Sequence, residues 1–533
     1  MNLILRFIIL ISLWLTAANA FSTSIEVSGN VSGVWNVDTV HVIGDLNIRE
    51  SDGLVINPGV IVLFQGTYVF NVCGTLKSVG SADQMISFTM ADTTGFYNDT
   101  IPDGGWKGIR YDNPAPWIDS SFFKYTRFSF GKAVSEDSLQ RLGGAICIRG
   151  FSKIGISHCV FYFNKANEKG GAVYLKNADI LLAYNEFDHN SSGEKIEPWG
   201  YGGAVCTDDG EPLILKNVFT NNLATGIGGA LAVRFADCPV FFNIFSGNAS
   251  AIGGAVAVLH VPACRHVISN NLIFGNHAVF FGGGVSNNNA SPVWVNNTIA
   301  LNTSESYGGA FYCKDSVNPK VYNSIIWGNQ ASVGSQVYLW ETYAQASFYH
   351  CDIQEGAEGF EGGGSGGAYT GEYINNIDAD PLFENSAEYH FNLTQESPCI
   401  NTGMPDTTGL MIPPSDLAGN PRIYGNCIDM GAYEYPFPVG QDEQSYTPDV
   451  VFYPLYPNPS VGEIICSFYL LKPAEVNFKL INNQGQIVSE LAKQNYQRGK
   501  HEIGWKENIP AGTYLVLLQA GSKIMKQKLV VSD

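Results

Sequence analysis

Residues 170–195 read GGAVYLKNADILLAYNEFDHNSSGEK, and two marks in this stretch recur along the middle of the chain. One mark is a Gly-Gly-Ala step followed by a short apolar run. The steps, 25 to 32 residues apart, begin at Gly143, Gly170, Gly202, Gly228, Gly253, Gly282 (as Gly-Gly-Gly-Val) and Gly308. The other mark is a Phe or Ile three residues ahead of an Asn, at Phe161, Phe187, Phe219, Phe245, Ile273, Ile299 and Ile326. Two interleaved marks with one period predict a solenoid, in which one supersecondary unit repeats and stacks.

The length of the repeat predicts the contents of each coil. About 25 residues accommodate three strands of roughly 3 to 6 residues with their bends. Parallel strands of successive coils lie about 4.8 Å apart, so corresponding residues stack in columns. One such column is predicted to hold Asn185, Asn217, Asn243, Asn271, Asn297 and Asn323. Their amides are expected to hydrogen-bond along the stack, to tolerate the left-handed backbone of a bend, or to do both.

The composition of the 533-residue chain indicates a folded, exported protein. It is 45% hydrophobic and 15% charged, which excludes wholesale disorder. The net charge of −19 argues against nucleic acid as a partner, because phosphates require clustered Lys and Arg. Residues 1–20 combine Arg6, an apolar stretch and Ala18-Asn19-Ala20, which is typical of a cleaved signal peptide. No other run approaches spanning length, so we expect no transmembrane segment after cleavage.

The chain divides into five predicted parts. After the signal peptide, residues 21–355 form the solenoid, and residues 356–435 are a Gly-rich excursion followed by an irregular cap. Residues 436–448 carry prolines and acids and indicate a linker. Short strands separated by Gly and Asn turns over residues 449–533 predict a small antiparallel β-sandwich. The predicted fold class is all-β: a parallel solenoid followed by a sandwich.

Eleven cysteines in an exported chain raise the question of disulfides. Cys147 and Cys206 lie two residues after the Ala of their steps, where other repeats have Tyr or Ala, so they are interpreted as small packing residues. Cys399 and Cys427 flank a loop-rich segment and are the disulfide candidates. No Cys/His cluster has zinc spacing, so no metal site of that kind is predicted.

Several segments resemble known families. Residues 143–329 resemble polymorphic outer-membrane-protein repeats and, more broadly, the right-handed parallel β-helix of pectate lyases, and residues 380–434 resemble the choice-of-anchor segment of exported bacterial proteins. The last 80 or so residues resemble a type IX secretion sorting domain of the type A kind. The residues that carry this resemblance include Asn458, Pro459, Gly485, Gly512, Tyr514 and Lys526. It implies that residues 449–533 engage the type IX machinery and that the protein is secreted or attached to the outer cell surface.

One column of the repeat carries the charged residues that are candidates for binding or catalysis. The residues six positions after each Gly step are Arg149, Lys176, Asp208, Arg234, Leu259, Asn288 and Lys314, with Asp209 beside Asp208. The residues Arg149, Lys176, Asp208, Asp209 and Arg234 are the predicted binding strip for an acidic sugar chain. Alternatively, they are solvated charges that form weak ion pairs and discourage aggregation.

The same strip bears on catalysis. Polysaccharide lyases of this fold need a Lys or Arg base near acidic calcium ligands, for which Lys176 and Arg234 are weak candidates. The sequence therefore favours a non-catalytic, adhesin-like protein that binds polysaccharide or cell-surface glycans and needs no cofactor. The alternative is a lyase or another carbohydrate-active enzyme, with calcium as a cofactor if it is a lyase.

Overall fold

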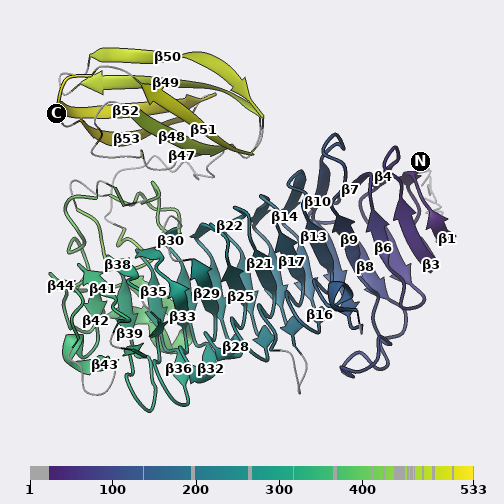
Figure 1. Cartoon of the computed structure of the whole chain (residues 1–533), viewed down its shortest axis with the longest axis horizontal. Helices are drawn as coiled ribbons and strands as arrows, with labels where there is room; N and C mark the ends of the chain where they lie inside the picture. The colour runs from purple at the N-terminus through teal and green to yellow at the C-terminus, as the bar shows by residue number, and fades with distance from the viewer. Residues whose placement is uncertain are drawn as a thin grey trace, which may run out of the picture.

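The computed structural model describes residues 23–436 and 450–531 apart from short gaps at 136, 194–198, 262–266, 316, 342, 364–368, 408, 411, 424–426, 453–454, 456–459, 461–462, 471–472, 483–485, 498, 507–508 and 522. The first part is a long parallel β-helix and the second a separate β-sandwich (Figure 1). The predicted signal peptide and nearly all of the predicted linker lie outside the described residues.

The strands of the β-helix stack in four parallel ladders. The first ladder consists of β6 (Phe70–Val72), β9 (Ile109–Asp112), β13 (Ile146–Arg149), β17 (Val173–Lys176), β21 (Val205–Asp208), β25 (Leu231–Arg234), β29 (Val256–Val261), β33 (Val285–Ala290), β37 (Phe311–Lys314), β40 (Val337–Leu339) and β43 (Glu361–Gly362). The second consists of β2 (Gly33–Trp35), β4 (Gly53–Ile56), β7 (Thr75–Val79), β10 (Ser121–Lys124), β14 (Ile154–Ser157), β18 (Leu181–Ala183), β22 (Leu213–Leu215), β26 (Val240–Phe241), β30 (Val267–Ser269), β34 (Val293–Val295), β38 (Lys320–Tyr322), β41 (Ser347–Tyr349) and β44 (Tyr373–Ile374).

The third ladder consists of β5 (Ile61–Phe64), β8 (Ile86–Met90), β11 (Thr126–Ser129), β15 (Val160–Tyr162), β19 (Glu186–Asp188), β23 (Val218–Thr220), β27 (Ile244–Ser246), β31 (Leu272–Phe274), β35 (Thr298–Ala300), β39 (Ile325–Trp327) and β42 (Asp352–Ile353). The fourth, which the three-strand prediction missed, consists of β12 (Lys132–Ala133), β16 (Lys165–Ala166), β20 (Ser191–Ser192), β24 (Leu223–Ala224), β28 (Ala249–Ile252), β32 (His277–Phe281) and β36 (Thr303–Ser304). At the N-terminal end β1 (Ser24–Asn30) pairs with β3 (Thr39–Ile48), which is long enough to pair with both β5 and β6.

The Gly-Gly-Ala step is the corner that leads into the first ladder. Its first glycine has a positive φ in every coil, for example 61° at Gly170 and 62° at Gly202, a conformation that costs glycine little. Its second glycine lies against the next coil: a Cβ on Gly203 would overlap the carbonyl oxygen of Gly229. The alanine that follows is fully buried. The step therefore recurs because backbone meets backbone at this corner.

The interior is filled by a stack of aromatic side chains. Phe128, Phe161, Phe187, Phe219 and Phe245 lie on the inner side of the third ladder, each fully buried. Successive rings are parallel, with centroids 4.7 to 4.9 Å apart. This is an offset-stacked geometry that aromatic pairs favour. The Phe of the second sequence mark is thus a core residue.

Two rows of buried asparagines run along the corners on either side of the third ladder. In the row that includes Asn185 and Asn217 (the Asn185 row), each Oδ1 accepts from the backbone N–H and the Nδ2 of the preceding coil, at 3.0 Å for this pair. The predicted stack is thereby confirmed, with one correction: Ser324, not Asn323, continues the row, since Asn297 N donates to Ser324 Oγ. A second row, from Asn164 to Asn329 (the Asn164 row), has the same bonds.

The β-helix extends past the predicted boundary at 355. Strand β43 pairs with β40 and β44 pairs with β41, and the 3-10 helix η2 (Gly356–Gly359) lies within this last coil. The following segment, with the hairpin β45 (Phe383–Asn385) and β46 (His390–Leu393) and the 3-10 helix η3 (Ser386–Glu388), folds back along the outside of earlier coils. It therefore covers the side of the β-helix, because its apolar residues pack on outward-facing side chains.

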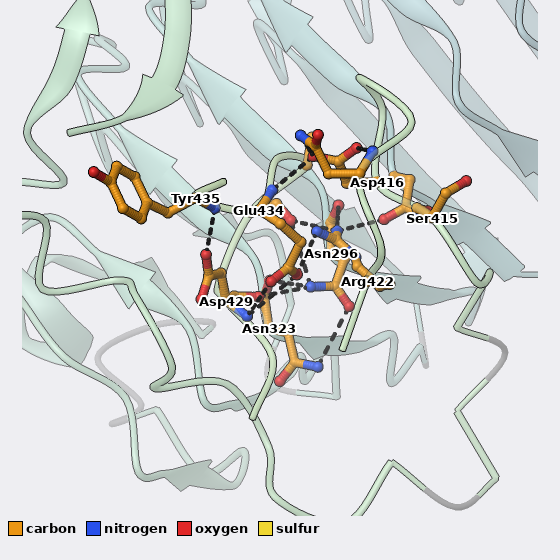
Figure 2. A network of polar contacts seen from close by, with 12 residues as sticks. Asn296, Asn323, Ser415, Asp416, Arg422, Asp429, Glu434 and Tyr435 are labelled. Carbon is orange, nitrogen blue, oxygen red and sulfur yellow. Dashed lines mark hydrogen bonds and ion pairs between the residues drawn. The ribbon is translucent and has the colours of Figure 1, made fainter. Parts of the chain in front are cut away.

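A buried polar network attaches this segment (Figure 2). Arg422, 1% exposed, donates to Glu434 Oε1 at 2.8 Å and to Gly431 O at 2.6 Å. Its second Nη also donates to Asn270 Oδ1, which belongs to a corner of the β-helix. Nearby, Asn296 Nδ2 donates to Asp429 O at 2.9 Å. A buried arginine with a carboxylate and carbonyl partners is strongly held, so the segment is part of the β-helix domain.

The C-terminal part is an antiparallel sandwich with its own core. One sheet has the order β47 (Val450–Phe452), β48 (Glu463–Leu470), β51 (Gly499–Lys506). The other has the order β50 (Ile487–Tyr496), β49 (Ala474–Asn482), β52 (Gly512–Ala520), β53 (Lys523–Val531). Buried residues of both sheets, among them Phe468, Phe478 and Leu518, form the core.

Candidate binding face

The outer side of the first ladder carries two rows of side chains. In β17, Val173 and Leu175 belong to the main core, whereas Tyr174 and Lys176 alternate with them and point outward. Register pairing stacks the outward residues of successive strands. The Tyr174 row contains Arg110, Cys147, Tyr174, Cys206, Ala232, Ala257, Ser286, Tyr312 and Tyr338. The Lys176 row contains Asp112, Arg149, Lys176, Asp208, Arg234, Leu259, Asn288 and Lys314. The predicted column is confirmed as a column, and Asp112 extends it.

Asp208 is the centre of a compact charged cluster. It is 6% exposed, and its oxygens pair with Arg234 Nη1 at 3.2 Å and with Lys169 Nζ at 3.0 Å. The Tyr174 hydroxyl donates to Asp208 Oδ2 at 2.8 Å. Burial and the carboxylate together raise the pKa of Tyr174 above its ordinary value, so the phenol keeps its proton. The Arg234 guanidinium lies 4.3 Å from the Tyr201 ring centroid. The Asp208 charge is thus compensated by two cations, and its Oδ2 already accepts from Lys169 and Tyr174.

The other predicted strip residues do not join this cluster. Lys176 is exposed. Asp209 follows β21 in the turn, with a φ of 61°. Arg149 pairs with Asp112 at 2.7 Å. The strip is therefore a series of local pairs along one face, and within the described residues no group of three or more His, Cys, Asp or Glu gathers as metal ligands would.

An aromatic cluster, which the sequence analysis missed, lies at the C-terminal end of the same face. Phe281 and Tyr307 stack at 5.5 Å, and Tyr307 and Tyr338 have centroids 4.7 Å apart. Trp340 follows β40, and its ring stands nearly perpendicular to those of Phe281 and Tyr307, at 86° and 87°. Tyr312 belongs to the same group. Trp340 remains 39% exposed.

The signal for this cluster was present in the repeat. The backbone of Gly334 has the same positive φ as the first glycine of the other steps, 65°, although its step reads Gly-Ser-Gln. Counting from it places Tyr338 in the Tyr174 row and Trp340 in the Lys176 row. Trp199 is also exposed, whereas Trp294 is a fully buried core residue.

The predicted disulfide between Cys399 and Cys427 does not form. Both are free thiols; Cys399 is buried and Cys427 is exposed. Cys399 instead donates to Asp352 Oδ2 at 3.1 Å. Burial raises the pKa of Asp352 to about 7. Other buried cysteines are packing residues, as Cys147 and Cys206 illustrate in the cluster around Tyr174.

Comparison with known proteins decides the nature of the C-terminal sandwich. Residues 454–532 match the family described as secretion system C-terminal sorting domain. The sandwich is a type IX sorting domain. The protein is therefore delivered outside the cell, where it is secreted or attached to the surface. No helix among the described residues is long and apolar enough to cross a membrane.

The residues that suggested the sorting domain are partly described. Gly512 and Tyr514 lie at the start of β52, and Lys526 is exposed in β53, opposite Leu517 of β52. Asn458, Pro459 and Gly485 lie outside the described residues. The match covers these positions as part of one continuous segment.

Two further proteins are similar to parts of this chain. A probable autotransporter, YfaL, of Escherichia coli (strain K12) is 31% identical over 132 residues, which is 22% of this chain. The chain spans only 11% of that autotransporter's length. A crystal structure of a variant of the periplasmic alginate epimerase AlgG aligns with a TM-score of 0.29 and 11% identity, covering 65% of this chain and 78% of the epimerase.

Proposed function

We propose that this secreted or cell-surface β-helix binds carbohydrate chains along the outer side of its first ladder, without transforming them. The observation that carries the proposal is the aromatic cluster around Trp340. A half-exposed indole held by neighbouring rings offers a rigid apolar surface, onto which the C–H-rich face of a pyranose ring stacks at low entropic cost. The regular coil spacing extends this face as a straight track.

The charged residues of the track support binding over lyase chemistry. Burial alone lowers the pKa of Arg234, but the neighbouring Cys206 and Asp208 raise it, and the net pKa lies above its ordinary value. A guanidinium in this state stays protonated, so Arg234 is suited to hold a sugar oxygen and unsuited to abstract a proton. Asp208 is engaged by Arg234, Lys169 and Tyr174, so its charge is compensated.

A glycan array probed with the full-length mature protein tests the proposal. We expect binding to one or more polysaccharides, and at least tenfold weaker binding for Trp340→Ala. Trp117→Ala is the matched control, because Trp117 is 72% exposed in the loop between β9 and β10 and should be neutral. Equal binding by wild type and Trp340→Ala contradicts the proposed surface.

Product analysis in the same samples separates binding from catalysis. We expect no unsaturated or reducing ends. Their appearance would contradict a purely binding role and would favour the lyase. In that case Lys176→Ala and Arg234→Ala should abolish the release of unsaturated uronate, and calcium should be tested as the cofactor.

A further inference from the structure

A pocket of about 440 Å³ opens at the N-terminal end of the same face. Its floor is formed by outward residues of β6, β9 and β13, including Asn71, Asp112 and Arg149. The segment after β12, with the 3-10 helix η1 (Ser138–Gln140), contributes Leu139 and Gln140 to the lining. The volume lies within the range of about 300 to 1,000 Å³ in which proteins bind small molecules.

The walls of the pocket are fixed by internal bonds. Arg110 Nη1 donates to the carbonyl oxygens of Leu142 and Gly143, at 2.7 and 2.6 Å. Within the segment that carries η1, Asp137 Oδ1 accepts from Leu139 N at 3.0 Å and Arg141 Nε donates to Ser135 O at 2.6 Å, so the segment is braced by its own bonds. A pocket whose lining is held by its own hydrogen bonds is preorganised, so a ligand does not have to order it.

The charges that line the pocket balance. Three basic residues, Lys107, Arg110 and Arg149, face three acidic ones, Asp45, Asp112 and Asp137. Arg149 and Asp112 form an ion pair at 2.7 Å. No excess of either sign remains to select an ionic ligand, and the lining instead offers donors and acceptors side by side.

Two further features define what fits. Among the described residues, none forms a hydrogen bond or ion pair with the Lys107 ammonium, which therefore has its donors available to a ligand. Leu139 is 54% exposed and, with Val69 and Val134, gives the pocket an apolar wall. Alternating donors and acceptors beside one apolar wall match a pyranose, which carries a rim of hydroxyls around a C–H face.

We propose that this pocket binds a single neutral sugar residue, as the terminal subsite of the carbohydrate track. In this arrangement Lys107 donates to sugar oxygens, Asp45 and Gln140 accept from hydroxyls, and Leu139 packs on the ring. The subsite rests on the proposed function in so far as it continues the same face, but it can be tested separately, because Lys107 lines the pocket and Trp340 does not.

Saturation-transfer NMR with the full-length protein tests the subsite, using glucose, galactose and mannose as probes and galacturonate and glucosamine as charged comparators. We expect saturation transfer to at least one neutral hexose, with weaker transfer to its charged comparators. Lys107→Ala should weaken that binding about tenfold, as loss of a hydrogen bond to a charged group does. Trp117→Ala, which changes an exposed tryptophan outside the pocket lining, should leave it unchanged.

The outcomes are distinguishable. Absence of transfer from all three neutral hexoses, unchanged binding by Lys107→Ala, or stronger binding of galacturonate overturns the subsite, even where polysaccharide binding persists. Loss of polysaccharide binding in Trp340→Ala, together with hexose binding that Lys107→Ala weakens, supports both proposals. Hexose binding by a protein that binds no polysaccharide supports the subsite and overturns the track.

Discussion

Replacing Asn222 with alanine should destabilise the β-helix by about 3 to 5 kcal/mol. Asn222 Nδ2 donates to Phe187 O and to Asn248 Oδ1, both at 2.9 Å. Its Oδ1 accepts from the backbone N and the Nδ2 of Asn190, both at 3.0 Å. Alanine removes these four bonds and leaves the buried N–H of Asn190 without its acceptor. An unsatisfied buried group costs about 1–3 kcal/mol, and the remaining bonds and the cavity add to this.

The neighbouring Asn221 provides a matched control. It is exposed and has a φ of 54°, and its side chain donates only to Asp188 Oδ1 at 3.2 Å. Glycine tolerates this conformation, so Asn221→Gly should change the free energy of unfolding by less than about 1 kcal/mol. The two asparagines are adjacent in sequence, and only the inward one is predicted to matter.

Urea unfolding of the full-length protein measures the difference. Tryptophan fluorescence reports on the β-helix through the buried Trp106 and Trp294. The shift of the transition midpoint multiplied by its slope gives the change in the free energy of unfolding. Equal midpoints for Asn222→Ala and Asn221→Gly would refute the idea that hydrogen-bonded asparagine rows hold successive coils together.

Three further predictions concern the corner glycine, a buried acid and the sorting domain. Gly203→Ala should lower the melting temperature strongly, because the added Cβ overlaps the carbonyl oxygen of Gly229. Gly275→Ala is the control: Gly275 has a φ of 61° but lies in open space, so this change should lower the free energy of unfolding by only about 1 kcal/mol. Similar losses of stability in the two variants would contradict the close backbone packing. Burial raises the pKa of Asp352 from 3.8 to about 7 in the folded state, so its contribution to folding stability is fully present below pH 4 and is lost as pH rises to 7. Asp352→Asn should therefore flatten the pH dependence of the unfolding free energy, by up to about 4 kcal/mol between pH 4 and 7. Parallel curves of unfolding free energy against pH for wild type and variant would contradict this prediction. Deletion of residues 449–533 should leave a folded β-helix in the periplasm, since the two domains have separate cores. Normal surface display of the truncated chain, assayed by cell fractionation, would contradict the sorting role.

The coil and its columns could be predicted from the sequence because backbone contact leaves few options. The second glycine of each Gly-Gly step lies against the next coil, so this corner accepts few other residues and its spacing marks the period of the repeat. The repeat is harder to recognise where the residues of this corner change, as in the Gly-Ser-Gln step at Gly334. The end of the solenoid was therefore placed at 355 although pairing continues to β44.

Neighbouring asparagines limited the prediction elsewhere. The left-handed bend residue and the inward row residue are adjacent, and asparagine suits both, as at Asn270 and Asn271. At the next coil Asn296 and Asn297 are also adjacent, and the sequence alone does not say which of them points inward. Asn323 was assigned to the row, but it has a φ of 48° and belongs to the bend, while Ser324 takes the inward position.

The contacts within the candidate site were also only partly predictable from the repeat. A column predicts which side chains stack, but not which side chains approach from a corner. Lys169 precedes its Gly step and forms an ion pair with Asp208 of the next coil. This ion pair compensates the charge of the carboxylate that the lyase hypothesis needs for calcium. The disulfide prediction was wrong for a related reason, since spacing alone did not reveal that Cys399 is buried against Asp352.

The separation between inner and outer rows explains where function is to be sought. Inside, the phenylalanine stack and the two asparagine rows join each coil to the next, so those positions accept few kinds of side chain. Outside, the first ladder needs only side chains that tolerate a stacked neighbour, and its middle has become a self-compensated charged cluster around Asp208. The two ends of this face retain unsatisfied surface: the half-exposed Trp340 at one end and the Lys107 pocket at the other. A ligand that gains from both must be long, and a polysaccharide chain lying along the coils satisfies that requirement.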